Sequence, residues 1–244
     1  MKTAVIAANW KMHKTIEEGI AFMQQFCNQE LSNEREYIFA TPDTMISPVA
    51  EVAENTGHVS IAAQNMYFED SGAFTGELSP FHVKDTGALY VLIGHSERRH
   101  VFGETNELLN KKMLAAETHG LTPIFCVGEN EEQRNTGNAE AVVLQQLQKG
   151  LAGLSPEFLQ QVIVAYEPVW AIGTGNTATV EQAEEMHAFI AQHVPNETRI
   201  LYGGSVKPAN ASELLTQEHI DGVLVGGASL EVESFTQICN AYIV

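Results

Sequence analysis

Positive charge is scarce in this 244-residue chain, where 13 lysine and arginine residues stand against 31 aspartate and glutamate residues, a formal net charge of −18. Such a balance repels the phosphates of nucleic acids and of anionic lipids, so we expect no nucleic acid and no membrane as partner. No apolar stretch approaches the roughly 20 residues that a membrane span needs. An anionic substrate would also be repelled at long range, so a site for one has to use local lysines and oriented backbone amides.

Cysteine is equally sparse, with Cys27, Cys126 and Cys239 far apart and in no CxxC pair. An odd and dispersed set argues against a disulfide framework and predicts reduced, buried thiols in a cytoplasmic protein. The N-terminal residues 1–6 enter a strand-like run at once and leave no room for the apolar core of a signal peptide. Histidines and carboxylates do not recur at the spacing of metal ligands, so we expect no metal site.

What the chain does contain is a regular alternation of strand-like and helix-like segments. Capping boxes at Thr15 and Thr179, an N-cap at Ser79 followed by Pro80, and a glycine stop at Gly120 predict helix ends. A polar helix is expected over 131–150. Short apolar runs predict strands at 4–8, 37–40, 59–63, 89–93, 122–127, 162–166, 199–202 and 223–225.

These runs show no polar alternation, which indicates strands covered on both faces, as in a parallel sheet. Eight such units in a chain near the typical length of about 250 residues predict one α/β domain over residues 1–244. We expect a closed (β/α)8 barrel of eight parallel strands with the helices outside. The alternative is an open doubly wound sheet, but no GxGxxG motif follows the first strand.

Side chains with chemical capacity follow the predicted strands at their C-terminal ends. In a parallel barrel these ends form the active-site rim, so we expect the side chains to share one site. Cys126 and Glu129, at the end of the fifth strand, are interpreted as structural. The other residues at this rim are Asn9, Lys11, Gln64, Asn65, His95, Ser96, Glu97 and Glu167.

Glu167 stands where the sixth strand ends, and Pro168 prevents that strand from continuing. An apolar segment follows and closes at Gly173 and Gly175. The loop 168–177 therefore has the composition of a lid that moves and excludes water, and a carboxylate deprived of water beside it becomes a stronger base. The simpler alternative is a surface glutamate before an ordinary loop.

Two glycine turns, Gly203–Gly204–Ser205 and Gly226–Gly227, follow the seventh and eighth strands. Without side chains, backbone amides approach a ligand closely, and this fold often binds phosphate at that position. Beside such an anion site, Lys11 would act as an electrostatic clamp rather than as an ordinary surface lysine. His95, more often a core histidine when it stands alone, would here face a helix N-terminus, which favours a neutral, hydrogen-bond-donating imidazole.

Several longer motifs also stand in a characteristic order along the chain. They are Asn-Trp-Lys-Met at 9–12, Ser-Gly-Ala-Phe-Thr-Gly-Glu at 71–77, Gly-His-Ser-Glu-Arg-Arg at 94–99, Tyr-Glu-Pro-Val-Trp-Ala-Ile-Gly-Thr-Gly at 166–175, Tyr-Gly-Gly-Ser-Val at 202–206 and Leu-Val-Gly-Gly-Ala at 224–228. With these motifs the chain resembles the triosephosphate isomerase family from end to end. The resemblance implies a homodimeric (β/α)8 (TIM) barrel that acts in glycolysis and gluconeogenesis without cofactor or metal.

The resemblance also implies an activity and a set of roles. The family interconverts dihydroxyacetone phosphate and D-glyceraldehyde 3-phosphate by proton transfer through an enediolate. By motif, Glu167 is the base, His95 the electrophile, Lys11 the group that stabilises negative charge, and Asn9 an orienting residue. The remaining positions are supporting Ser96 and Glu97 (the latter paired with Lys11), a phosphate cradle at Gly173, Ser205, Gly226 and Gly227, the lid 168–177, and a loop 64–77 that docks into the partner subunit with Thr75 near its site.

Two other functions remain as alternatives. Another phosphate-binding barrel, such as an epimerase or a phosphoribosyl isomerase, would explain the glycine turns but not the Glu-Pro lid. A non-catalytic anion-binding protein would explain the glycine turns as well. The joint presence of Glu167, His95 and Lys11 argues against that last reading.

Overall fold

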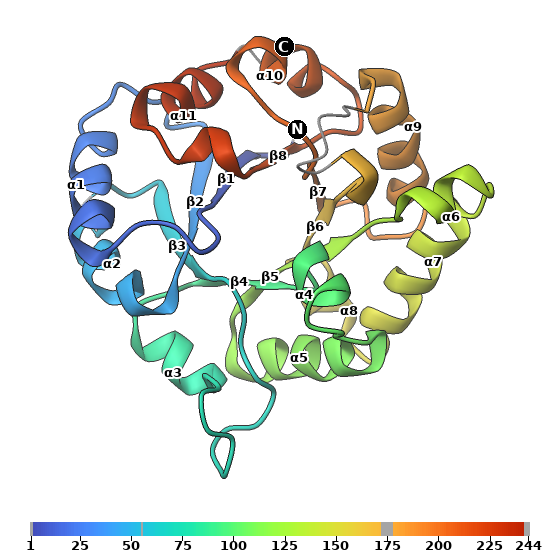
Figure 1. Ribbon diagram of the computed structural model, residues 1–244, viewed down its shortest axis with the longest axis horizontal. Helices are drawn as coiled ribbons and strands as arrows, with labels where there is room; N and C mark the ends of the chain where they lie inside the picture. Colours follow the sequence, from blue (N-terminus) through green and yellow to red (C-terminus); the bar gives the residue numbers. More distant parts are fainter. Residues whose placement is uncertain (1, 55, 172–177, 242–244) are drawn as a thin grey trace.

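The computed structural model describes residues 2–54, 56–171 and 178–241. Eight strands pair in the order β1-β2-β3-β4-β5-β6-β7-β8, and β8 pairs with β1, so the sheet closes on itself (Figure 1). Every pair is parallel, with Val5 of β1 opposite Gly222 of β8 at the closure. This confirms the closed (β/α)8 barrel and excludes the open sheet. The strands are β1 (Ala4–Asn9), β2 (Arg35–Thr41), β3 (Val59–Ala63), β4 (Tyr90–Ile93), β5 (Thr122–Val127), β6 (Ile163–Tyr166), β7 (Arg199–Tyr202) and β8 (Gly222–Val225).

Helices form a ring outside the strands (Figure 1). The predicted capping boxes at Thr15 and Thr179 are present, and Gly120 adopts the left-handed conformation at the end of its helix. Within the described part of the chain, no helix is long and apolar enough to cross a membrane. The helices are α1 (Ile16–Phe26), α2 (Ile46–Ala53), α3 (Pro80–Asp85), α4 (Ser96–His100), α5 (Asn106–His119), α6 (Glu131–Asn135), α7 (Ala139–Gly150), α8 (Pro156–Leu159), α9 (Val180–Ala191), α10 (Pro208–Leu215) and α11 (Val232–Cys239), with short 3₁₀ turns η1 (Asp43–Met45), η2 (Val169–Ala171) and η3 (Gly227–Ser229).

The single polar helix expected over 131–150 is wrong. The segment folds as two helices, α6 and α7, separated at residues 136–138. Gly137 between them has a φ of +74°, a conformation that glycine adopts without strain and that ends a right-handed helix. The break turns α7 back along the barrel, where it packs beside α5 and α9.

Two apolar layers hold the barrel. An outer layer between strands and helices contains a cluster of aromatic rings, in which Phe39 of β2 contacts Trp10, Phe26 and Phe235. The strands are thus covered on both faces, which explains why their sequences lack polar alternation. The interior layer is filled by Val5, Ala7, Ile38, Ala40, Ala62, Leu92, Ile124, Cys126, Ile163, Ala165, Leu201 and Leu224.

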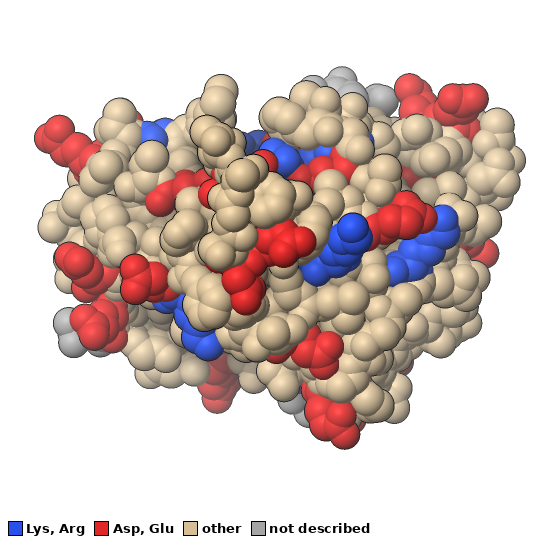
Figure 2. Space-filling view, turned by 90° about the horizontal axis from the view of Figure 1, so that it is seen from below, with Lys and Arg blue, Asp and Glu red and all other residues tan. Residues whose placement is uncertain are grey.

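At the N-terminal ends of the strands, charged side chains pair with one another. Arg199 of β7 donates to the Glu36 carboxylate of β2 at 2.6 Å, and the Tyr90 hydroxyl donates to the same carboxylate. Lys2 Nζ lies 2.9 Å from the Asp221 carboxylate. These groups satisfy each other across the barrel end. Elsewhere, acidic side chains are dispersed with basic ones between them, as the face in Figure 2 shows.

Two buried helical glycines test how tightly the outer layer is packed. A Cβ at Gly150 of α7 would lie 2.2 Å from the Phe125 ring, whereas a Cβ at Gly19 of α1 would meet the flexible end of Met45 at 2.9 Å. We expect Gly150→Ala to lower the free energy of unfolding by about 1–3 kcal/mol because the ring has to shift. Gly19→Ala should be close to neutral, since better helix propensity, about 1 kcal/mol, offsets the contact. Urea unfolding of both variants measures this, and equal losses would contradict it.

Candidate active site

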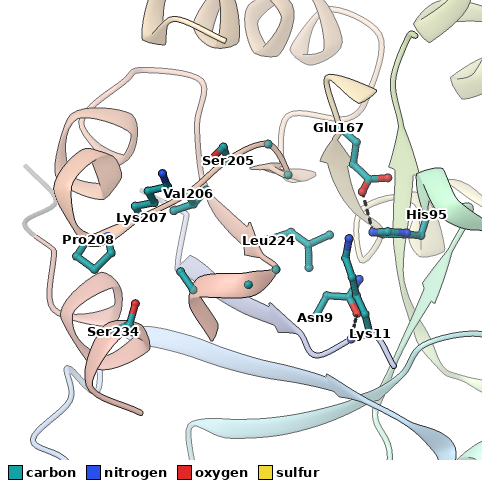
Figure 3. A pocket seen from close by; sticks show the side chains of 15 residues that line it. Asn9, Lys11, His95, Glu167, Ser205, Val206, Lys207, Pro208, Leu224 and Ser234 are labelled. Carbon is teal, nitrogen blue, oxygen red and sulfur yellow. Dashed lines mark hydrogen bonds and ion pairs between the residues drawn. The ribbon is translucent and has the colours of Figure 1, made fainter. Parts of the chain in front are cut away.

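The C-terminal ends of β1, β4, β6, β7 and β8 border a cavity of about 590 Å³ (Figure 3). The structure therefore brings together residues that the sequence separates by more than 200 positions. Gly173 and the rest of 172–177 lie outside the described residues, so their expected part in the lid and cradle is not described. The predicted site residues that line the cavity are Asn9, Lys11, His95, Glu167, Ser205, Gly226 and Gly227.

Glu167 and His95 face each other across the cavity wall, with Oε1 of the carboxylate 3.0 Å from Nε2 of the ring (Figure 3). The backbone N–H of Ser96 donates to the other carboxylate oxygen, Oε2, at 2.8 Å. Glu167 is 2% exposed and His95 is 6% exposed. The carboxylate is thus almost dry and rests on the first turn of α4.

This resting position controls the basicity of Glu167. Burial alone would raise its pKa, but the hydrogen bond from His95, the Ser96 N–H and the Lys11 charge together hold the pKa below its usual value. Glu167 is therefore ionised at neutral pH. A carboxylate that leaves His95 and Ser96 while staying dry loses what lowers its pKa and becomes a stronger base.

His95 is the N-cap of α4, and its Nδ1 accepts the backbone N–H of Glu97 at 3.2 Å. Burial lowers the pKa of His95, but the carboxylates of Glu167 and Glu97 raise it above the usual histidine value. We nevertheless assign the neutral ring, with its proton on Nε2, because a protonated Nδ1 has no lone pair for the Glu97 N–H. The carboxylate that raises the pKa of His95 most is that of Glu167.

Lys11 has a φ of +51°, which is uncommon for a residue with a side chain. Its backbone is held on both sides: the N–H donates to Asn9 Oδ1 at 3.0 Å, and the carbonyl accepts from Gln64 Nε2 at 2.9 Å. Its Nζ lies 2.7 Å from the Glu97 carboxylate, the pairing that the resemblance implies. Backbone strain held in place by neighbouring side chains is typical of functional sites.

The glycine turns differ in what they do. A Cβ at Gly227 would meet nothing within 4 Å, so its backbone is open to the cavity, whereas a Cβ at Gly204 would lie 2.2 Å from the Tyr202 hydroxyl. Gly204 is therefore required by packing, and Gly227 leaves room for a ligand. Lys207 and Ser234 also line the cavity, at its end remote from Glu167, and sequence reasoning missed both (Figure 3).

Two further glycines make room for Glu167, a role that the sequence did not predict for either of them. A Cβ at Gly128 would lie 1.8 Å from the Glu167 carbonyl oxygen, and one at Gly203 would lie 2.9 Å from Glu167 Cγ. Gln146 of α7 holds Gly128 from both sides, accepting its N–H at 2.7 Å and donating to its carbonyl at 3.0 Å. The position of Gly128, directly after the fifth strand, was the available signal.

Glu129 was expected to be structural, and the structure shows which groups it binds. Its buried Oε1 accepts from the Trp170 indole at 2.8 Å, from Arg134 at 3.0 Å and from the Tyr166 hydroxyl at 3.1 Å. Trp170 belongs to η2, the described first part of the expected lid. Glu129 thus ties the start of that loop to the barrel rim.

Parallel strands that close on themselves, with the chemically capable groups gathered at one rim, are the architecture of a (β/α)8-barrel enzyme. Among the residues that the structure describes, no group of three or more His, Cys, Asp and Glu side chains could hold a metal ion. The family model described as triosephosphate isomerase matches residues 4–242. The chain belongs to the triosephosphate isomerase family and is an isomerase that acts on a small molecule, which confirms the family resemblance.

Gly128 tests whether the position of Glu167 depends on its surroundings. We expect Gly128→Ala to lower kcat by about 100-fold or more, because displacement of a catalytic group by about 1 Å costs that much. The coupled isomerase assay, with circular dichroism to confirm folding, measures it. Gly57→Ala is the control: a Cβ at Gly57, whose φ is +69°, would meet nothing within 4 Å, so that variant should keep its activity. Normal turnover in Gly128→Ala would contradict the inference.

Proposed function

We propose that this protein interconverts dihydroxyacetone phosphate and D-glyceraldehyde 3-phosphate by moving one proton between adjacent carbons through an enediolate. The observation that carries the proposal is the contact of the dry Glu167 carboxylate with His95 Nε2, 3.0 Å apart. A weak base removes the proton from a carbon next to a carbonyl much faster when an electrophile stabilises the negative charge that develops on the carbonyl oxygen. Those two groups meet here at the wall of a cavity that ends in open glycine backbone.

In the proposed reaction, Glu167 leaves Ser96 and takes the proton from the substrate carbon. The neutral His95 ring, with its proton on Nε2, then donates to the carbonyl oxygen on which negative charge develops. Each such interaction contributes several kcal/mol at the transition state when the site is dry. Glu167 returns the proton to the neighbouring carbon, and His95 Nε2 takes back a proton from the hydroxyl on the carbon that lost one first. Each of the two groups therefore acts in turn as acid and as base.

Lys11 and Asn9 complete this end of the site. The Lys11 ammonium carries the positive charge that the enediolate oxygen and the phosphate both require, and Glu97 holds it at 2.7 Å in the absence of substrate. Asn9 is 5% exposed and fixes the strained Lys11 backbone through its Oδ1. Asn9 also lines the cavity, and in this proposal its amide group orients the substrate oxygen.

The phosphate is proposed to bind at the backbone of Ser205, Gly226 and Gly227. The lack of a side chain at Gly227 lets a phosphate oxygen come within hydrogen-bond distance of backbone N–H groups. The protein as a whole is acidic, so this local cradle, with Lys11 and Lys207 on the cavity wall, supplies the attraction that the surface lacks. Gly173 is proposed as the fourth member by motif.

A homodimer is proposed because a second cavity, of about 330 Å³, adjoins the first and shares Asn9, Lys11 and His95 with it. The loop 64–77 projects from the body of the molecule between β3 and α3 (Figure 1). Its Phe74 is 40% exposed, and Met12 and Phe102, which line the second cavity, are 95% and 65% exposed. Docking of this loop from a second copy, with Thr75 at its tip, would cover those apolar side chains.

The cellular setting is proposed from the same chemistry. Triose phosphates are intermediates of glycolysis and gluconeogenesis, and a cytoplasmic location agrees with the three free cysteines, Cys27, Cys126 and Cys239. The enzyme needs no cofactor in this proposal, because proton transfer uses only side chains.

Shortening the proposed base tests its role. Glu167→Asp keeps the charge but retracts the carboxylate by one methylene, so we expect kcat to fall by about 100-fold or more with a small change in KM. An assay coupled to NADH oxidation, with D-glyceraldehyde 3-phosphate as substrate, measures both constants. An unchanged kcat would remove Glu167 from the reaction. No turnover by the unmodified protein would overturn the proposed function itself.

A charge at the tip of the loop tests the dimer. Thr75→Arg would put a long, charged side chain where the loop is proposed to enter a cavity of about 330 Å³, so we expect monomers by light scattering and a fall in kcat of about tenfold or more. Gln161→Arg adds the same charge at the opposite end of the barrel and serves as control. A dimeric and fully active Thr75→Arg variant would place the loop outside any interface.

A further inference from the structure

Arg99 lies on α4, four residues after His95, and received no role from the sequence. Its guanidinium donates three hydrogen bonds: Nε to the Gly94 carbonyl at 2.8 Å, a terminal nitrogen to the Cys126 carbonyl at 2.9 Å, and the other terminal nitrogen to Asn106 Oδ1 at 2.7 Å. None of these three acceptors carries a charge. A partly buried arginine usually has a carboxylate for partner, so its charge needs another explanation.

The acceptors of Arg99 belong to the backbone that carries the catalytic pair. Gly94 directly precedes His95, and Cys126 precedes Val127, whose carbonyl accepts the Glu167 N–H at 2.7 Å. One planar fork therefore fixes the C-terminal ends of β4 and β5 relative to each other. Gly94 has a φ of +79°, and a Cβ there would lie 3.0 Å from the guanidinium, so the glycine makes room for this contact.

The charge of Arg99 has few carboxylates to interact with. Glu104, just before α5, is already held by Lys112 and Arg98, each at 2.7 Å. The other carboxylate whose charge Arg99 feels is that of Glu167, directly after β6. His100 on the same helix and the Cys126 thiol are the remaining titratable groups that interact with it.

We propose that Arg99 is a positioning residue for the proton transfer, which holds His95 and Glu167 in register and supplies a fixed positive charge that keeps Glu167 ionised. This rests on the proposed function. In the resting state, His95, Ser96 and Lys11 stabilise the Glu167 charge. When the carboxylate moves to substrate it gives up the first two, and Lys11 turns to the substrate oxygens. Arg99, bound to backbone carbonyls, stays in place.

The test separates the effect of the hydrogen bonds of the Arg99 guanidinium from the effect of its positive charge. Arg99→Lys keeps the charge but cannot reach three acceptors, Arg99→Gln removes the charge, and Asn106→Ala removes only the acceptor on α5. The readout is the exchange of the α-hydrogen of D-glyceraldehyde for deuterium, followed by NMR across pH. This substrate has no phosphate, whose own pKa near 6 would otherwise obscure the acid limb of the pH–rate profile, in which the rate falls as Glu167 is protonated.

We expect Arg99→Gln to raise the pKa of the acid limb by about 0.5–1 unit and to slow exchange by about tenfold or more. Arg99→Lys should slow exchange without moving the limb, and Asn106→Ala should resemble the unmodified protein in both. His95, Lys11 and Cys126, which also face Glu167, are unchanged in all three variants.

An unmoved limb in Arg99→Gln, or equal shifts in Arg99→Gln and Arg99→Lys, would overturn the proposed role of the charge. Exchange in Asn106→Ala as slow as in Arg99→Lys would overturn the role of the two hydrogen bonds to backbone carbonyls. The slower exchange would then be explained by the lost contact of Arg99 with α5 alone. The proposed function is tested separately: if the unmodified protein turns over D-glyceraldehyde 3-phosphate and only the Arg99 predictions fail, the isomerase proposal stands.

Discussion

The contact between Glu167 and His95 depends on closure of the barrel. The two residues follow β6 and β4, which pair with β5 but not with each other, so their distance is set by the radius and stagger of the sheet. The interior layer of valine, leucine, isoleucine and alanine side chains sets that radius. Apolar packing deep in the barrel is therefore what holds a buried carboxylate 3.0 Å from an imidazole.

The features of the fold that could be predicted from the sequence are those that depend on the type of side chain. Strands covered on both faces give unbroken apolar runs, and helix ends give capping residues, so eight strands and most helices were found. The prediction of one helix over 131–150 was wrong because most residues in this segment favour a helix, and a single glycine among them is a weak signal for a break. Gly137 nevertheless ends α6, and the packing of α7 on the barrel selects the break.

The rim residues could be predicted because a parallel barrel fixes which strand ends face the site. What could not be predicted is how those residues are held. Gly128 makes room for a carbonyl oxygen, and Arg99 donates to two carbonyls, and a carbonyl is present at every residue. Such contacts leave no signature in residue type, so only the folded chain identifies the side chains that make them.

The two ends of the barrel differ in how their charges are used. At one end Arg199 pairs with Glu36 and Lys2 pairs with Asp221, and at the other end Lys11 pairs with Glu97 and Glu167 pairs with His95 at the wall of a cavity, where we propose that a substrate displaces these partners. The charged groups that hold the structure together and those at the cavity thus lie at opposite ends of the same sheet. The loops at the C-terminal end can therefore change in sequence during evolution while the ion pairs at the N-terminal end keep the strands of the barrel aligned.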